Sequence, residues 1–424
     1  MFKKIVQIFK DKELRNKMLF ILMCFAIFRL MANIPIPGVD PENLKKLFTD
    51  FQAFGLLNLF TGGALENLSI VMLGVGPYIT ASIIFQLLTM IFPQIEEMYK
   101  EEGEAGKQKF NQYTRIATVP LAMLQGYSML SLFEKREIIG AMDPMGLITS
   151  ALTITAGTII LMWLGELVSE KGIGEGVSLF IFAGIAADFP SNLLQIFSSW
   201  TISQLPSYVL FFVMAFLIIT GVVLVNEGKR NIPVSYAKRV RGGKMYGGSS
   251  TFLPLNINPA GVMPIIFSLS FLTLPAMLGS LLGGGDTGVA GFLMKVAGFF
   301  ENSIAYAIVY FILVFGFTYF YTMITFDPSN IADNLKKMGG FVPGIRPGES
   351  TVRYLSTVLN RILPFGALFL GIIAVLPQFI GNITGIFAFR FLIGGTSLLI
   401  VVSVVLETMR QINAQLQMRE YDTF

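Results

Sequence analysis

The chain has 424 residues, of which 54% are hydrophobic and only 14% are charged, and its net charge is +4. Soluble globular domains usually carry about 25% charged residues, so this composition and a mean hydropathy of +0.67 indicate a polytopic membrane protein. The chain has no histidine and a single cysteine, Cys24. These counts exclude histidine-based catalysis, histidine metal sites, an intramolecular disulfide and a cysteine metal cluster.

Residues 1–17 mix apolar and basic side chains at helical spacing. This pattern fits an amphipathic helix at the lipid headgroups and, equally well, a solvated helix end. The apolar runs that follow predict ten membrane spans, because a helix needs about 20 apolar residues to cross a bilayer. The expected spans cover residues 18–34, 69–92, 114–133, 147–167, 176–189, 207–226, 259–282, 303–325, 361–380 and 387–407.

The basic residues are distributed unequally between the two sides of this ten-span arrangement. The side with both chain ends carries 24 of the 31 Lys and Arg residues, and the opposite loops carry 6. The remaining one, Arg29, lies inside the first span, where it can reach the headgroups or pair with another group. Since cytoplasmic loops are enriched in Lys and Arg, we expect both ends in the cytoplasm.

Two loops on the expected cytoplasmic side, residues 227–258 and 326–361, are long and basic. Loops of this length are usually functional or disordered. Their charge suits an acidic partner, such as anionic lipid, RNA or a protein surface. Signalling of membrane topology alone is the alternative.

The second span contains two glycines and a proline, Gly74, Gly76 and Pro77. Proline breaks or kinks a helix, and in lipid a broken helix leaves unpaired backbone groups. The feature is therefore either an ordinary proline kink or a break that borders protein or a water-filled cavity.

Two short motifs recur five spans apart and favour the second interpretation. Residues 74–79 (GVGPYI) and 261–266 (GVMPII) match at four of six positions, and so do residues 176–181 (GVSLFI) and 395–400 (GTSLLI). Paired Gly/Pro interruptions are typical of membrane proteins built from two internal repeats. Because five spans separate the copies, the two halves are expected to be inverted relative to each other.

The repeat selects six aliphatic residues on four helices. Ile79 is equivalent to Ile266 and Ile181 to Ile400, while Ile83 and Val177 each lie four residues from a selected one on the same helix face. Around a common axis they would form an apolar constriction that excludes ions. An ordinary packed core of branched aliphatics is the alternative.

Several kinds of chemistry are missing from the sequence. It contains no phosphate-binding G-x-x-x-x-G-K-[ST] loop, no HExxH motif and no G-x-S-x-G motif. Acidic residues inside the spans are nearly absent, whereas ion-coupled transporters usually carry buried carboxylates. We therefore expect a passive conduit with no cofactor and no metal, driven from outside.

Five segments resemble the SecY family, the channel subunits of bacterial protein translocases. The resemblance covers essentially the whole length and is most specific in residues 74–88 (GVGPYITASIIFQLL), 162–185 (MWLGELVSEKGIGEGVSLFIFAGI), 258–267 (NPAGVMPIIF), 331–348 (IADNLKKMGGFVPGIRPG) and 391–402 (FLIGGTSLLIVV). It implies an all-α fold with ten transmembrane helices in two inverted five-helix halves around an hourglass pore.

The resemblance also implies a division of the chain and a pore ring. A cytoplasmic amphipathic segment (1–17) would precede the first half (18–189) and the second half (207–407), and residues 408–424 would form a cytoplasmic tail. The ring implied by the family is the set that the repeat selects: Ile79, Ile83, Val177, Ile181, Ile266 and Ile400. Val177 replaces the commoner isoleucine, which should loosen the seal only slightly.

Two moving parts are implied as well. A half-buried plug helix would lie at about residues 56–68 and include Asn58, Leu59, Phe60, Gly62, Gly63, Leu65 and Asn67, although an outer-loop helix is the plain alternative. A lateral gate would lie between two pairs of spans, with the second and third spans on one side and the seventh and eighth on the other. Its expected lining is Ser82, Gln86, Gln125, Ser268, Ser270, Thr273 and Leu274.

The partners follow from the same resemblance. The ribosome or the ATPase SecA would dock on the two long loops, through Arg230, Lys238, Arg239, Arg241, Lys244 and Arg346. The small membrane subunits SecE and SecG, anionic phospholipid, signal peptides and unfolded preproteins complete the expected partners. The expected location is the bacterial plasma membrane.

The expected function is a protein-conducting channel, not an enzyme, that moves unfolded secretory chains across the membrane and releases apolar segments sideways into lipid. A secondary transporter of a small solute is the rival hypothesis, and the scarcity of buried carboxylates disfavours it. A membrane-embedded enzyme is disfavoured because no nucleophile–base set is visible.

Overall fold

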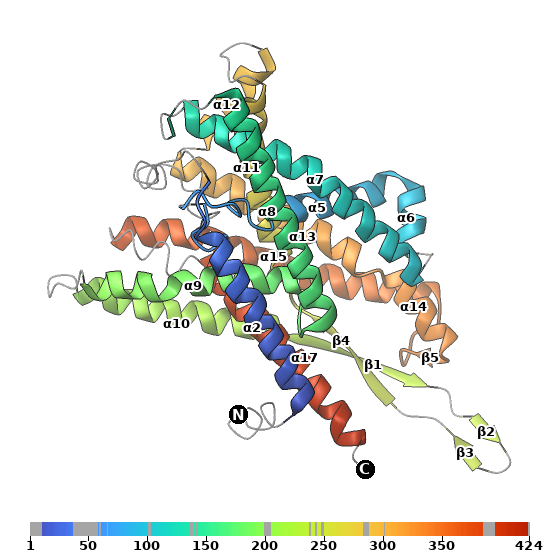
Figure 1. Cartoon of the computed structure of the whole chain (residues 1–424). Helices are drawn as coiled ribbons and strands as arrows, with labels where there is room; N and C mark the ends of the chain where they lie inside the picture. The colour runs from blue at the N-terminus through green and yellow to red at the C-terminus, as the bar shows by residue number, and fades with distance from the viewer. Residues whose placement is uncertain are drawn as a thin grey trace.

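The structure is a computed structural model that describes residues 11–36, 58, 61–65, 67–100, 103–135, 139–140, 143–198, 205–236, 239–241, 244–246, 250–282, 288–300, 302–384 and 395–422. It is mostly helical (Figure 1). The helices are α2 (Lys12–Ala32), α5 (Gly76–Ile91), α6 (Pro93–Lys100), α7 (Gly103–Lys135), α8 (Pro144–Lys171), α9 (Gly176–Ser198), α10 (Leu205–Glu227), α11 (Met263–Leu281), α12 (Gly288–Phe299), α13 (Ser303–Thr325), α14 (Pro328–Lys337), α15 (Glu349–Thr384) and α17 (Gly395–Asp422).

Each of the ten predicted spans coincides with one of these helices. By length and hydropathy alone, six helical segments of the described chain can cross a membrane, in α7, α8, α10, α13, α15 and α17. A seventh would join α5 to α6, but these two helices are bent by 113° at their junction. The apolar segments within α9 and α11 are shorter, and α2 is not among the helices that pass this test. The described helices therefore fit the ten-span arrangement, with some spans shorter than the bilayer is thick.

The second and seventh spans begin in the same way, and each begins later than the hydropathy predicts. Gly74 and Gly261 both have left-handed backbones, with φ of +56° and +62°, a conformation that favours glycine. Pro77 and Pro264 then lie in the first turns of α5 and α11, where a missing backbone N–H costs nothing. The breaks thus precede the helices and do not kink them.

A small sheet, which the sequence analysis did not predict, joins the two long loops. Its strands are β1 (Lys229–Tyr236), β4 (Ser250–Asn256) and β5 (Gly340–Phe341), in the antiparallel order β4-β1-β5. Ile232, Leu255, Val342 and Leu355 form a buried cluster beneath it. A second pair, β2 (Arg239–Arg241) and β3 (Lys244–Tyr246), extends from the hairpin, away from the helices (Figure 1).

The two ends of the helical body lie on one side of the molecule. Figure 1 shows the start of α2 and the end of α17 at the side from which the β1–β4 hairpin projects, while α12 lies at the opposite side. This arrangement fits the even number of spans in the ten-span prediction.

Candidate functional site

The six aliphatic residues selected by the repeat are all buried in the main apolar core of the described chain. Ile79 and Ile83 lie on α5, Val177 and Ile181 on α9, Ile266 on α11 and Ile400 on α17. Every one of them is at most 8% exposed, and all belong to the largest core cluster of the described chain. Residues as far apart as 79 and 400 in the sequence thus belong to one continuous apolar core, which extends through most of the described helices.

Backbone contact between α8 and α9 fixes the position of two of these residues. A Cβ on Gly176 would lie 1.8 Å from the carbonyl oxygen of Gly165, so only glycine fits there. The Ser169 hydroxyl accepts a 2.8 Å hydrogen bond from the Gly176 amide. Because Val177 follows Gly176 directly, this close crossing sets where α9 starts and which way Val177 and Ile181 face.

A cavity of about 590 Å³ borders this apolar core. Ile79 and Val177 line it, together with Met263 and Phe267 from the start of α11. Polar and charged residues line the rest: Tyr78, Ser82, Gln86, Glu104, Asn111, Arg115, Glu166, Ser169, Glu170, Glu175 and Tyr321. A cavity with a mostly polar lining thus borders two of the six aliphatic side chains.

The charges in this cavity are mainly acidic. Arg115 and Glu166 form an ion pair across α7 and α8. Glu175 lies in the turn between α8 and α9, where partial removal from water raises the pKa of its carboxyl. The Ser178 hydroxyl, which donates a 2.8 Å hydrogen bond to that carboxyl, opposes the shift, and Glu407 adds to it. Sequence reasoning missed this group because its members lie at the ends of separate helices.

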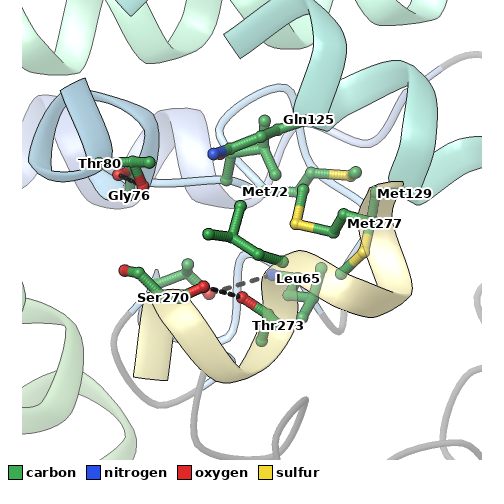
Figure 2. Close-up of a pocket in the computed structure, with 12 residues that line it drawn as sticks. Leu65, Met72, Gly76, Thr80, Gln125, Met129, Ser270, Thr273 and Met277 are labelled. Carbon is green, nitrogen blue, oxygen red and sulfur yellow. Dashed lines mark hydrogen bonds between the residues drawn. The ribbon is translucent and has the colours of Figure 1, made fainter. Parts of the chain in front are cut away.

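A smaller cavity, of about 60 Å³, lies between α11 on one side and α5 and α7 on the other. Figure 2 shows its lining: Leu65, Met72, Gly76, Thr80, Gln125, Met129, Ser270, Thr273 and Met277 are labelled there. Thr273 donates a 3.0 Å hydrogen bond to the carbonyl of Ser270 in its own helix. The surface between the helices is therefore largely apolar, with several flexible methionines.

The predicted gate residues fall into three places. Gln125, Ser270, Thr273 and Leu274 line the smaller cavity, whereas Ser82 and Gln86 line the larger one and bond to each other. Ser268 is fully buried and donates to the Pro264 carbonyl. Thr80, Met72, Met129 and Met277 were missed, since methionine and threonine in an apolar span carry no distinctive pattern.

In the described part of the predicted plug, residues 58 and 61 are helical, and residues 62–65 and 67–68 form turns. Residues 61–65 are all buried, more so than the half-buried helix expected, and Asn67 is exposed. Thr61 and Leu65 line the smaller cavity. Asn58 is part-buried, and Leu59 and Phe60 lie outside the described residues.

The predicted docking residues lie on the joined loops. Arg230 is exposed on β1, and Arg346 is exposed in the turn that follows β5. Arg239, Arg241 and Lys244 belong to β2 and β3 at the end of the hairpin, and Lys238 lies outside the described residues.

These features define a class: a polytopic helical membrane protein with a polar cavity that borders an apolar core, and with a helix interface beside it. The sequence matches the SecY family over residues 69–409, and the chain belongs to that family. It is 41% identical to the protein translocase subunit SecY of Corynebacterium glutamicum, with 99% of this chain and 98% of that protein covered. The corresponding subunit of Streptomyces galbus is 43% identical, with 98% of each chain covered.

Solved structures share the fold at lower identity. A structure described as that of a protein conducting channel has a TM-score of 0.62 and 19% identity, and the match covers 93% of this chain and 91% of the other. Sec61 in the canine ribosome-channel complex has a TM-score of 0.58 and 18% identity, with the same coverage.

Proposed function

We propose that this SecY-family chain is a protein-conducting channel. It moves unfolded secretory chains across the membrane and lets apolar segments leave sideways into lipid. The observation that carries the proposal is the polar cavity that ends at Ile79 and Val177, with Ile83, Ile181, Ile266 and Ile400 buried in the same apolar cluster. Aliphatic side chains have no fixed partners for an ion, so such a constriction blocks ions by dewetting.

The proposed ring suits a polypeptide substrate for a physical reason. An unfolded chain brings side chains of every size and charge, so a site that bound any of them specifically would hold it back. Aliphatic side chains offer only non-directional contacts, each of about 0.1–0.2 kcal/mol per atom pair. The ring can therefore close around a moving chain without retaining it.

The interface between α11 and the pair α5 and α7 is the proposed lateral gate. Gln125, Ser270, Thr273 and Leu274 lie at its cavity, and Ser82, Gln86 and Ser268 lie elsewhere along α5 and α11. Polar contacts between membrane helices average only about 0.6 kcal/mol, so this interface opens at low cost. A signal peptide, itself an apolar helix, replaces the contacts that are lost.

The joined loops are the proposed docking face for a ribosome or for SecA. Arg230 and Arg346 are exposed there, and basic residues suit acidic partners such as RNA. SecE, SecG and anionic phospholipid complete the proposed assembly. The 24 basic residues predicted on this side support a cytoplasmic location for the docking face and for both chain ends. The proposed membrane is the bacterial plasma membrane.

Transport itself tests the proposal. The chain is reconstituted into vesicles with its small subunits, and SecA, ATP and an unfolded precursor are added outside. Precursor that becomes resistant to added protease, only when ATP is present, is the expected result. A chain that conducts a small solute under these conditions but protects no precursor would contradict the proposal and favour a solute transporter.

A further inference from the structure

The charged side chain inside the first span has defined partners in the structure. Arg29 lies in the last turn of α2. Its Nη1 donates a 2.6 Å hydrogen bond to the carbonyl oxygen of Gly62, and its Nη2 lies 3.4 Å from Oδ1 of Asp188 on α9. One guanidinium group therefore joins two helices to residues 61–65, which we call the plug segment.

The plug segment lies so close to α9 that only glycine fits at its centre. Gly62 has a φ of +64°, and a Cβ there would lie 2.7 Å from the Cα of Gly184. Gly63 has a φ of +76°, and a Cβ there would lie 3.5 Å from a carboxylate oxygen of Asp188. Since Arg29 binds a backbone carbonyl, its hydrogen bond depends on where the plug segment lies and not on a side chain of that segment.

Part of the plug segment also borders the proposed lateral gate. Thr61 and Leu65 line the same cavity as Gln125 of α7 and Thr273 of α11 (Figure 2). The segment that Arg29 holds therefore also fills the space between the gate helices. Any displacement of α11 from α7 removes part of the surface against which the plug segment packs.

We propose that Arg29 and Asp188 are positioning residues for the plug, an inference that rests on the proposed channel function. Arg29 holds the plug segment against α9 in the resting channel, and Asp188 orients the guanidinium. A charge-assisted hydrogen bond is stronger than a neutral one. A single such bond, with the Arg29 side chain 42% exposed, can still break when the gate opens and re-form afterwards.

Arg29→Gln removes the charge and the forked donor geometry together. We expect the resting complex in vesicles to leak ions several-fold faster than wild type. Asp188→Asn should increase the leak by less, because Arg29 keeps its bond to Gly62. Lys17→Gln, which removes a charge from α2 at its Glu13 pair, is the matched control. A leak equal to that of the control would overturn the proposal.

A disulfide that fixes the plug segment makes the test specific. A Cβ on Gly74 would lie 3.7 Å from the Cβ of Thr61, which is within the range of natural disulfides. Thr61→Cys and Gly74→Cys are combined with Cys24→Ala, with and without Arg29→Gln. Oxidation should restore ion tightness to the leaking Arg29→Gln channel. A leak that persists after oxidation comes from elsewhere and would overturn the proposal.

The same variants separate this inference from the function on which it rests. With Arg29 intact, the reduced cysteine pair should move a precursor and the oxidised pair should not. If neither moves any precursor while wild type also fails, the channel function is wrong. If transport is normal but Arg29→Gln leaks no more than Lys17→Gln, only the positioning role is wrong.

A second variant covers the case in which Arg29→Gln does not accumulate. Arg29→Lys keeps the positive charge but has a single donor group in place of the guanidinium fork, so it is expected to leak ions at an intermediate rate.

Discussion

At the scale of single residues, the proposed channel depends on how well six aliphatic side chains exclude water. Ile400 is fully buried, and it is contributed by the helix furthest along the sequence. The repeat alone was sufficient to select Ile79, Ile181, Ile266 and Ile400, because equivalent positions in two inverted halves face the same axis. Their burial in one cluster agrees with that selection, and their role as a ring remains a prediction.

Ile400→Asn tests the ring at this scale. An amide in place of the buried aliphatic group costs about 2–4 kcal/mol of stability and brings water into the constriction. We expect a several-fold higher ion leak and transport of precursors with defective signal peptides, measured in vesicles. Leu399→Asn, at the preceding position of α17 and also buried, is the control for destabilisation alone. The ring would be ruled out if Ile400→Asn leaked ions no faster than Leu399→Asn and if Ile266→Asn leaked no faster than wild type.

At the scale of elements, the position of the ring depends on how closely α8 and α9 cross. A Cβ on Gly176 would overlap the Gly165 carbonyl, so Gly176→Ala must push the start of α9 outwards. We expect a loss of about 1–3 kcal/mol of stability, typical of overpacking, and an increased ion leak. Gly146→Ala on α8, where a Cβ meets nothing, should be neutral or stabilising. A Gly176→Ala variant as stable and tight as Gly146→Ala would contradict this account.

The gate is also an element-scale prediction. Thr80 on α5 and Ser270 on α11 line the same cavity (Figure 2). Both are replaced with cysteine in a Cys24→Ala background and joined by a short bifunctional maleimide, which should stop membrane insertion of apolar segments. Gly126→Cys and Ile154→Cys, which lie close together on α7 and α8, provide a cross-link within one half that should have no effect. Full insertion through the Thr80–Ser270 cross-link would rule out this gate.

The sequence predicted the elements better than the contacts between them. Every predicted span coincides with a helix. The starts of α5 and α11 are shifted, because glycines with left-handed backbones end the preceding loops before the prolines begin the helices. Strand β5 has only two residues, so no sequence pattern could have shown that it pairs with β1. The hydrogen bond from Arg29 to Gly62 could not be predicted from the sequence either, since it joins a side chain to a backbone carbonyl 33 residues away.

At the scale of the whole molecule, the pairing of β1 with β5 joins the two long loops, which together form the proposed docking face. Arg346→Glu changes the charge of the exposed turn beyond β5 without touching the buried Val342. We expect SecA-driven or ribosome-driven transport to fall about tenfold, while membrane insertion of the channel itself is unchanged. Lys295→Glu, on α12 at the opposite side (Figure 1), is the matched charge reversal. Equal transport by the two variants would remove Arg346 from the docking face.

The central claim is that a translocating chain passes through the aliphatic ring, and position-specific photocross-linking tests it most directly. A photoreactive phenylalanine analogue is placed at Ile181, at Ile400 or, as the control, at Phe216, which is 70% exposed on α10. A precursor is then arrested in transit in the reconstituted complex. The account predicts cross-links to the precursor from positions 181 and 400 and none from position 216. Cross-links from position 216 alone, or equal yields from all three positions, would contradict it.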